Sequence, residues 1–169
     1  MPAVMPSLQQ AGSTLGQYPS FGLAMRFQVT VDDLTDLGLW QSCAGLKVEL
    51  KYKAVEQGGQ YTQVTQLPDK LAYGPVTLER AVEARSSTQV QAWLAQYVQG
   101  WRVYPRSPGA IPPSTNVTIR LLDYQLLPVM TWTLQYARPS KWELTTLSAK
   151  DSKVAIEVLS FEHEGFLQV

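Results

Sequence analysis

NVTIRLLDYQLLPVMTWTLQYARPSKWELTTLSAKDSKVAIEVLSFEHEGF, residues 116–166, contains three segments with the side-chain pattern of β-strands. Apolar and polar residues alternate over 117–122 and again over 130–136, and 153–163 is rich in β-branched and aromatic residues. Alternation with a period of two places successive side chains on opposite faces of a sheet. These residues therefore predict antiparallel strands joined by tight turns, and a mainly β fold.

A first strand is predicted ahead of this stretch, where residues 25–31 alternate in the same way. We expect Asp32-Asp33 to end it and a loop to continue to about Trp40. A further strand is predicted over 76–82, after the Gly74-Pro75 break.

The longest predicted hairpin begins at Leu46. One face of its first strand is apolar or aromatic and the other is charged, and Gly58-Gly59 provides the turn to a return strand over 61–67. The apolar face with the turn and the first return residue comprises Leu46, Val48, Leu50, Tyr52, Ala54, Gly58, Gly59 and Tyr61, and the charged face comprises Lys47, Glu49, Lys51 and Lys53.

One helix is predicted over 86–100. Ser86 and Gln89 have the spacing of a capping box, and Gly100 suits the C-terminal stop. An apolar stripe runs through Val90, Trp93, Leu94, Tyr97, Val98 and Trp101, whereas the opposite face holds Gln89, Gln91, Gln96 and Gln99. Because this segment has no charged residue, we expect its glutamine face to be covered by another subunit; a glutamine-rich surface helix of a monomer is the alternative.

Two segments differ from the rest in composition. Residues 1–20 hold three prolines and no charge, so we interpret them as an extension preceding a single β domain over 21–169. Residues 102–115 hold four prolines and are expected to form an extended loop.

Charge is scarce in this chain. Fourteen basic and fourteen acidic residues cancel, and charged residues make up 17% of the chain, against about 25% in typical soluble domains. A neutral, charge-poor surface resists association weakly, so we expect a subunit largely covered by partners. Nucleic acid is not expected as a partner because no concentrated basic face is present. One cysteine and the lack of a secretory signal favour cytoplasmic assembly, and no apolar run is long enough to span a membrane.

Two residues were considered for chemistry. His163, flanked by Glu162 and Glu164, has the neighbours of a general base, but a solvent or interface residue at a strand end is the better interpretation. Cys43 has no histidine near it in sequence, which favours a small buried residue or an unreactive thiol.

No metal or cofactor site is expected. Asp32, Asp33 and Asp36 lack the glycine and distal glutamate of a calcium loop, so a turn is the better interpretation. Nucleotide-binding and hydrolase fingerprints are also missing. We therefore expect no catalytic residue and no enzyme activity.

The five tryptophans leave open a carbohydrate-binding β-sandwich, because such modules bind sugars on aromatic platforms. Core packing explains Trp93, Trp101 and Trp132, which lie on apolar faces, whereas Trp40 and Trp142 lie near turns and are expected to be more exposed.

Four segments in order carry a resemblance to a known family: FGLAMRFQVTVDDL (21–34), CAGLKVEL (43–50), QLPDKLAYGPVTLERAV (66–82) and VTIRLLD through EGF (117–166). Together they resemble the phage tail tube family, in particular the tube proteins of contractile injection systems. The chain departs from that pattern at Asp69, where the family usually has glycine, and at Ala81.

The resemblance implies an antiparallel β-sandwich or barrel with one flanking helix, which closes into a ring-shaped barrel when six copies assemble. It further implies stacked rings that form a hollow tube, which a contracting sheath expels, and a hairpin arm over 46–67 that reaches towards the next ring. The implied partners are further copies, sheath subunits, baseplate or hub proteins, and a cargo or tape-measure protein in the lumen. The charged face beginning at Lys47 is a candidate lumen face, with an ordinary solvated face as the alternative. A tube-initiator ring next to the baseplate is the alternative position within the same apparatus.

Overall fold

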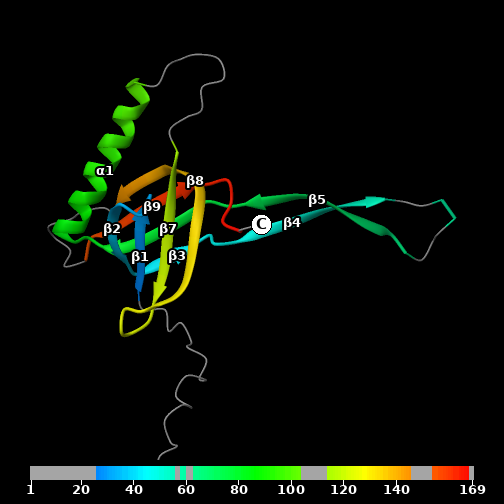
Figure 1. Cartoon of the computed structure of the whole chain (residues 1–169), viewed down its shortest axis with the longest axis horizontal. Coiled ribbons are helices and arrows are strands. Elements are labelled where there is room, and N and C mark those ends of the chain that lie inside the picture. Colours follow the sequence, from blue (N-terminus) through cyan, green and yellow to red (C-terminus); the bar gives the residue numbers. More distant parts are fainter. Residues whose placement is uncertain (1–25, 56–57, 60–62, 104–113, 146–153, 168–169) are drawn as a thin grey trace, which may run out of the picture.

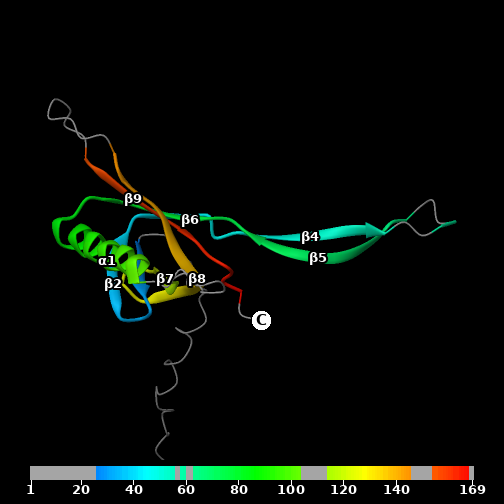
Figure 2. The same cartoon turned by 90° about the horizontal axis from the view of Figure 1, so that it is seen from above.

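The computed structural model describes residues 26–55, 58–59, 63–103, 114–145 and 154–167. Seven strands form one antiparallel sheet in the order β2-β1-β7-β8-β9-β6-β3. The strands are β1 (Arg26–Val31), β2 (Thr35–Trp40), β3 (Ser42–Ala44), β6 (Val76–Ala81), β7 (Thr115–Leu122), β8 (Pro128–Leu144) and β9 (Ile156–Glu162). A helix, α1 (Ala84–Val103), lies along one side of the sheet (Figures 1 and 2).

The sheet curls into a barrel because two of its strands turn corners. Gln41 alone separates β2 from β3, although these strands stand at opposite ends of the strand order. Since one residue spans at most about 3.6 Å, the two ends of the sheet must meet. The second corner lies in β8, which pairs with β7 up to Ala137 and with β9 from Arg138 onward. Tyr136 sits at this corner with φ of 51°.

Side chains from both halves of the barrel and from α1 fill one core. Val29, Trp40, Ile119 and Leu134 belong to the half around β1, and they are fully buried. The helix contributes Val90 and Trp93, and the Trp93 ring lies 5.9 Å from that of Phe161. The core thus holds α1 firmly against the sheet.

The three strands predicted in 116–166 are present, and so is the strand over 76–82, which ends at Ala81 as β6. The second predicted strand is longer than its alternating segment, since β8 continues to Leu144. The strand predicted over 25–31 is described from Arg26.

The prediction of a loop from Asp33 to Trp40 was wrong, because β2 occupies Thr35–Trp40. Asp32 and Asp33 both have positive φ, at 49° and 54°, and Leu34 N donates to Val31 O. This is the backbone of a type I′ turn, whose twist suits a two-residue hairpin. The two aspartates therefore join β1 directly to β2.

The predicted ends of the helix were also wrong. α1 begins at Ala84, so Ser86 lies inside the first turn, and the helix continues through Gly100 to Val103. Glu83 precedes the helix: its backbone N donates to Ser87 Oγ, and its carboxylate accepts from Ser86 Oγ. The extension over 1–20, and most of the proline-rich segment over 102–115, lie outside the described residues.

Candidate assembly surfaces

A two-stranded arm projects from the barrel (Figures 1 and 2). It consists of β4 (Val48–Val55) and β5 (Thr65–Tyr73), which pair only with each other. Eight residues at about 3.3 Å each give β4 a length of roughly 26 Å. Residues 49–54 and 65–71 are exposed on both faces of the arm. An isolated two-stranded sheet is marginally stable in water; that this arm packs against another copy remains a prediction.

The two faces of the arm differ in chemistry. Leu50 pairs with Leu71 and Tyr52 pairs with Pro68 on one face, and the exposed fractions of Leu50 and Tyr52 are 58% and 56%. Lys51 pairs with Lys70 on the other face.

Residues Glu49, Lys51 and Lys53 alternate with the apolar ones, and Lys47, just before β4, forms an ion pair with Glu49 at 3.5 Å. That this charged face lines a lumen remains a prediction.

The return strand was predicted too early, over 61–67, whereas β5 begins at Thr65 and ends at Tyr73. The turn residues Gly58 and Gly59 are exposed, and Gly59 has φ of 92°. Tyr61 lies outside the described residues, and Leu46 precedes β4 and packs partly buried against the barrel core.

A β-bulge interrupts the arm at Asp69. Lys51 pairs with Lys70 and the next residue, Tyr52, pairs with Pro68, so Asp69 has no cross-strand partner. The bulge leaves a hollow of about 270 Å³, lined by Leu50, Lys51, Tyr52, Pro68, Asp69, Lys70 and Leu71. A β-bulge changes the direction in which a side chain points from its strand.

The exposed side of α1 matches its predicted composition. Gln89, Gln91, Gln96 and Gln99 are all exposed in the isolated chain, so their burial in an assembly remains a prediction. The stripe is buried at Val90, Trp93 and Tyr97, but Val98 and Trp101 are 47% and 58% exposed. Assigning Trp101 to the core was therefore wrong.

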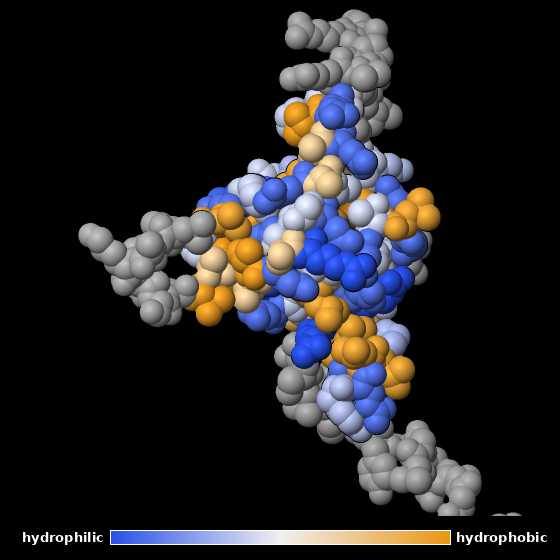
Figure 3. Space-filling view, turned by 90° about the vertical axis from the view of Figure 1, so that its left-hand side faces the viewer, coloured by the Kyte–Doolittle hydropathy of each residue, from blue (hydrophilic) through white to orange (hydrophobic). Residues whose placement is uncertain are grey.

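The barrel retains open strand edges. Within the described residues, β2 has a ladder partner only in β1, and the part of β8 before Gln135 has one only in β7. Unpaired edge groups are a template for pairing with another chain. Exposed apolar side chains lie close by, including Leu39, Leu127 and Met130. Seen from the side opposite the arm, hydrophobic patches lie at the margins of the molecule around a hydrophilic centre (Figure 3).

A buried ion pair ties the helix to the sheet. Arg80 on β6 and Glu157 on β9 are direct cross-strand partners, 2% and 0% exposed, with 2.7 Å between Arg80 Nε and Glu157 Oε2. The same oxygen accepts from Ser87 Oγ of α1 at 2.8 Å, and Oε1 accepts from Trp142 Nε1 at 2.9 Å. The alternation of Val76, Leu78 and Arg80 on β6 was the available signal that this arginine faces inward.

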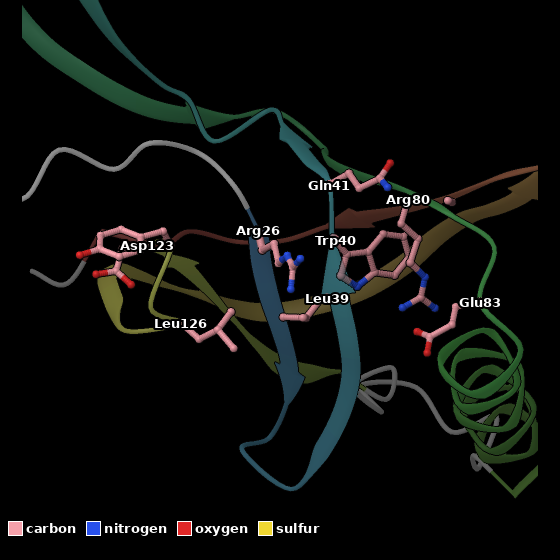
Figure 4. A pocket seen from close by; sticks show the side chains of 10 residues that line it. Arg26, Leu39, Trp40, Gln41, Arg80, Glu83, Asp123 and Leu126 are labelled. Carbon is pink, nitrogen blue, oxygen red and sulfur yellow. The ribbon is translucent and has the colours of Figure 1, made fainter. Parts of the chain in front are cut away.

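A pocket of about 670 Å³ opens beside this cluster (Figure 4). The Arg80 guanidinium lies 4.2 Å from the centroid of the Trp40 ring, and its Nη1 donates to Leu37 O. Arg80 Nη2 and Trp40 Nε1 are buried, and neither has a hydrogen-bond partner among the described residues. Arg26 and Leu39 line one side, and the turn between β7 and β8 forms another wall through Asp123, Tyr124 and Leu126.

Trp40 and Trp142 do not form a sugar-binding platform. Trp40 is fully buried, so its predicted exposure was wrong. Trp142 is half-buried and donates to Glu157. A bulge at Gly38 puts Leu37 and Trp40 out of simple alternation, and both side chains turn inward.

The two residues considered for chemistry, His163 and Cys43, are partly buried. His163 follows β9, half-buried, with ring centroids 5.5 Å from Tyr73 and 5.8 Å from Phe166. Burial lowers its pKa, against the backbone of Gly74 and Gly165 and the Glu162 carboxylate. Burial raises the pKa of the Cys43 thiol from 9.0 to about 11.

The aspartates over 32–36 serve the β1–β2 turn rather than a cation. Asp32 Oδ1 accepts from Asn116 N, and Asp36 Oδ1 accepts from Gly38 N. No group of histidine, cysteine, aspartate and glutamate side chains in the described ranges is arranged to hold a metal ion. Nor does this part of the chain contain a helix long and apolar enough to cross a membrane.

Comparison with known proteins identifies the family. Residues 23–167 match the model of the T4-like virus tail tube protein gp19. No curated protein matches the chain. The chain belongs to the tail tube protein family, whose members are structural subunits of tubes.

Solved structures of injection particles contain similar folds. A chain in the anti-feeding prophage baseplate, determined with 6-fold symmetry, is 26% identical, with a TM-score of 0.62 over 86% of this chain and 93% of that one. A chain in the sheath–tube complex of the extracellular contractile injection system PVC is 17% identical, with a TM-score of 0.62 over 84% and 86%. A chain in the anti-feeding prophage tube-terminating cap is 16% identical, with a TM-score of 0.61 over 94% and 95%.

Proposed function

We propose that this chain builds the inner tube of a contractile injection particle, as hexameric rings stacked into a hollow conduit that a contracting sheath expels. Family membership supports the tube, and the 26% identity to a chain of a 6-fold baseplate supports both the kind of particle and the ring number. The observation that carries the proposal is the open barrel edges at β2 and β8 together with the doubly exposed arm.

Assembly follows physically from these surfaces. Pairing the free edge of β2 with that of β8 on the next copy would satisfy backbone groups that no strand pairs in the monomer. Leu37 O and Gly38 N are exceptions on β2, since they bond Arg80 Nη1 and Asp36 Oδ1 within the chain. Because such a contact joins two different surfaces, it is heterologous, and it closes into a ring when the rotation between copies allows. The arm would then pack across copies, and the glutamine face of α1 would meet a sheath subunit.

The partners follow from this position. They are further copies of the chain, sheath subunits outside the tube, baseplate or hub proteins at its end, and a cargo or tape-measure protein within it. Assembly would take place in the bacterial cytoplasm, and the finished tube would be part of a phage tail-like particle.

A second position in the same apparatus is the ring next to the baseplate. The baseplate chain is 26% identical to this one, against 17% for the sheath–tube chain, over similar coverage. Copy number separates the two positions, since a tube body needs many rings and an initiator needs one. Quantitative mass spectrometry of purified particles, scaled to the sheath subunit, measures that ratio.

Electron microscopy and light scattering of the purified full-length chain test the main proposal. Rings or tubes with six-fold end views are expected to form as concentration rises. A chain that stays monomeric at high concentration, and that elutes late from an immobilised polysaccharide column, would instead favour the carbohydrate-binding alternative.

A further inference from the structure

The pocket beside Arg80 contains buried hydrogen-bond donors that have no partner in the described part of the chain. Arg80 and Trp40 are 2% and 0% exposed, and Arg80 Nη2 and Trp40 Nε1 have no acceptor among the described residues. Buried donors in folded proteins nearly always have a partner. Arginine and tryptophan side chains only donate, so the missing partner is a hydrogen-bond acceptor.

Two acidic side chains that line the pocket already accept hydrogen bonds from their own chain. Glu83 accepts from Ser86 Oγ at 2.6 Å, and Asp123 Oδ1 accepts from the backbone N of Gln125 and Leu127. Arg26, at the mouth of the pocket, is exposed and forms no ion pair with any residue of the described ranges. The two buried groups of the pocket that lack a partner, Arg80 Nη2 and Trp40 Nε1, are thus both donors, and Arg26 adds a cation at the mouth, which fits a carboxylate.

The same chain carries a carboxylate that lacks a partner. Among the described residues, the exposed carboxylates with no side-chain hydrogen bond or ion pair are Asp69, Glu79 and Glu162. Glu79 and Glu162 lie on strands of the barrel itself, whereas Asp69 stands at the bulge of the projecting arm. Of the three, Asp69 is the one on the two-stranded arm, which pairs with no strand of the barrel.

The surroundings of the two groups match as well. The hollow around Asp69 is lined by apolar or aromatic residues, including Leu50, Tyr52 and Leu71, and by Lys51 and Lys70. The wall of the pocket is a projecting apolar turn, in which Tyr124 is 76% and Leu126 is 52% exposed. Two backbone donors to Asp123 fix the shape of this turn. One surface thus combines the projecting Tyr124–Leu126 turn with buried hydrogen-bond donors, and the other combines a hollow with the carboxylate of Asp69.

We propose that Asp69 on the arm of one copy enters the Arg26–Trp40–Arg80 pocket of a second copy, with the Tyr124–Leu126 turn seated in the hollow of the arm. This contact rests on the proposed self-assembly and specifies which surfaces meet.

Charge reversal tests the contact in the full-length chain. Asp69→Lys and Arg26→Glu are each expected to weaken self-association roughly ten- to hundredfold, as the loss of a charged hydrogen bond does. The double variant Asp69→Lys/Arg26→Glu is expected to recover only the part of that loss that comes from Arg26, because lysine cannot accept from Arg80 Nη2 or Trp40 Nε1. Glu162→Lys is the matched control, because it reverses another unpaired carboxylate on the barrel, and it should assemble like the wild type. Thermal unfolding of each variant shows that the fold is retained.

Cross-linking gives a second measurement that does not depend on charge. In a Cys43→Ala background, one variant carries Asp69→Cys and another carries Arg26→Cys. A short bis-maleimide is expected to join the two variants in mixed assemblies, and much less within either variant alone. Suppose that the wild-type chain assembles, that Asp69→Lys assembles equally well and that no cross-link forms. This result would overturn the contact and leave the proposed function in place. A wild-type chain that never assembles would overturn the proposed function, and the contact with it.

Discussion

Replacing Glu157 by glutamine is expected to destabilise the fold far more than its isosteric shape suggests. Glu157 is fully buried, and its two oxygens accept from Arg80, Ser87 and Trp142. Glutamine places an NH₂ group where one oxygen was, so a donor meets a donor in either orientation of the amide. It also leaves the buried Arg80 guanidinium without its counter-charge.

The magnitude follows from the burial of both partners. Removing one member of a buried ion pair costs about 3–5 kcal/mol. For a chain of 169 residues, about 1 kcal/mol corresponds to roughly 2–4 °C in Tm, so a drop of roughly 6–20 °C is expected. Chemical denaturation with urea, followed by tryptophan fluorescence, measures the free energy of unfolding directly.

The control is Glu143→Gln, which breaks the exposed Lys141–Glu143 pair at 2.8 Å. Exposed pairs contribute about 0–1 kcal/mol, so this variant should unfold nearly like the wild type. If Glu157→Gln loses less than about 1 kcal/mol, the cluster does not hold α1 to the sheet in the way described.

Three smaller predictions concern a glycine and two titratable side chains. Gly45→Ala should lower the unfolding free energy by about 1–3 kcal/mol, because φ is 92° and the new Cβ would lie 2.0 Å from Pro75 O; Gly58→Ala, with nothing within 4 Å, should change it little. Burial lowers the pKa of His163 below 6.5, so stability should be unaffected above pH 6.5 and fall as the pH drops below it; a pH series that shows the same slope in His163→Gln would contradict this. Cys43, with its pKa raised to about 11, should react with a thiol reagent at pH 8 about 100-fold more slowly than an unburied thiol whose pKa is 9.0; an equal rate would show that the thiol is open to water.

Alternation in the sequence predicted those strands whose two faces have different environments. Residues 117–122 and 130–136 alternate clearly, and both lie in strands of the barrel. The arm alternates just as clearly, although neither of its faces is buried in the isolated chain. Alternation therefore indicates that the two faces of a strand differ. It does not say whether the apolar face packs on the core of the same chain or on a partner.

Backbone geometry explains the strand that was missed. Asp32 and Asp33 adopt the left-handed conformation that usually indicates glycine or asparagine, so the tight turn was interpreted as the start of a loop. The bulge at Gly38 then shifts the inward positions to Leu37 and Trp40. Each feature hides the period of two on which the prediction depends.

The assembly surfaces could be predicted only in part. The hairpin and the glutamine face were visible as composition, but the pocket depends on Trp40, Arg80 and Asp123, which are far apart in the sequence and meet only through strand order. The Arg80–Glu157 pair was likewise hidden, because a single sequence does not give the register between β6 and β9.

The position of β9 between β8 and β6 has a consequence for synthesis on the ribosome. The half of the barrel that carries β6 and β3 is joined to the other half through β9, whose residues 156–162 are translated after all the other described strands. A nascent chain cannot close the barrel before those residues have left the exit tunnel, and such long-range pairing is slow to form. A chain that stops before β9 therefore cannot join β6 and β3 to the rest of the barrel.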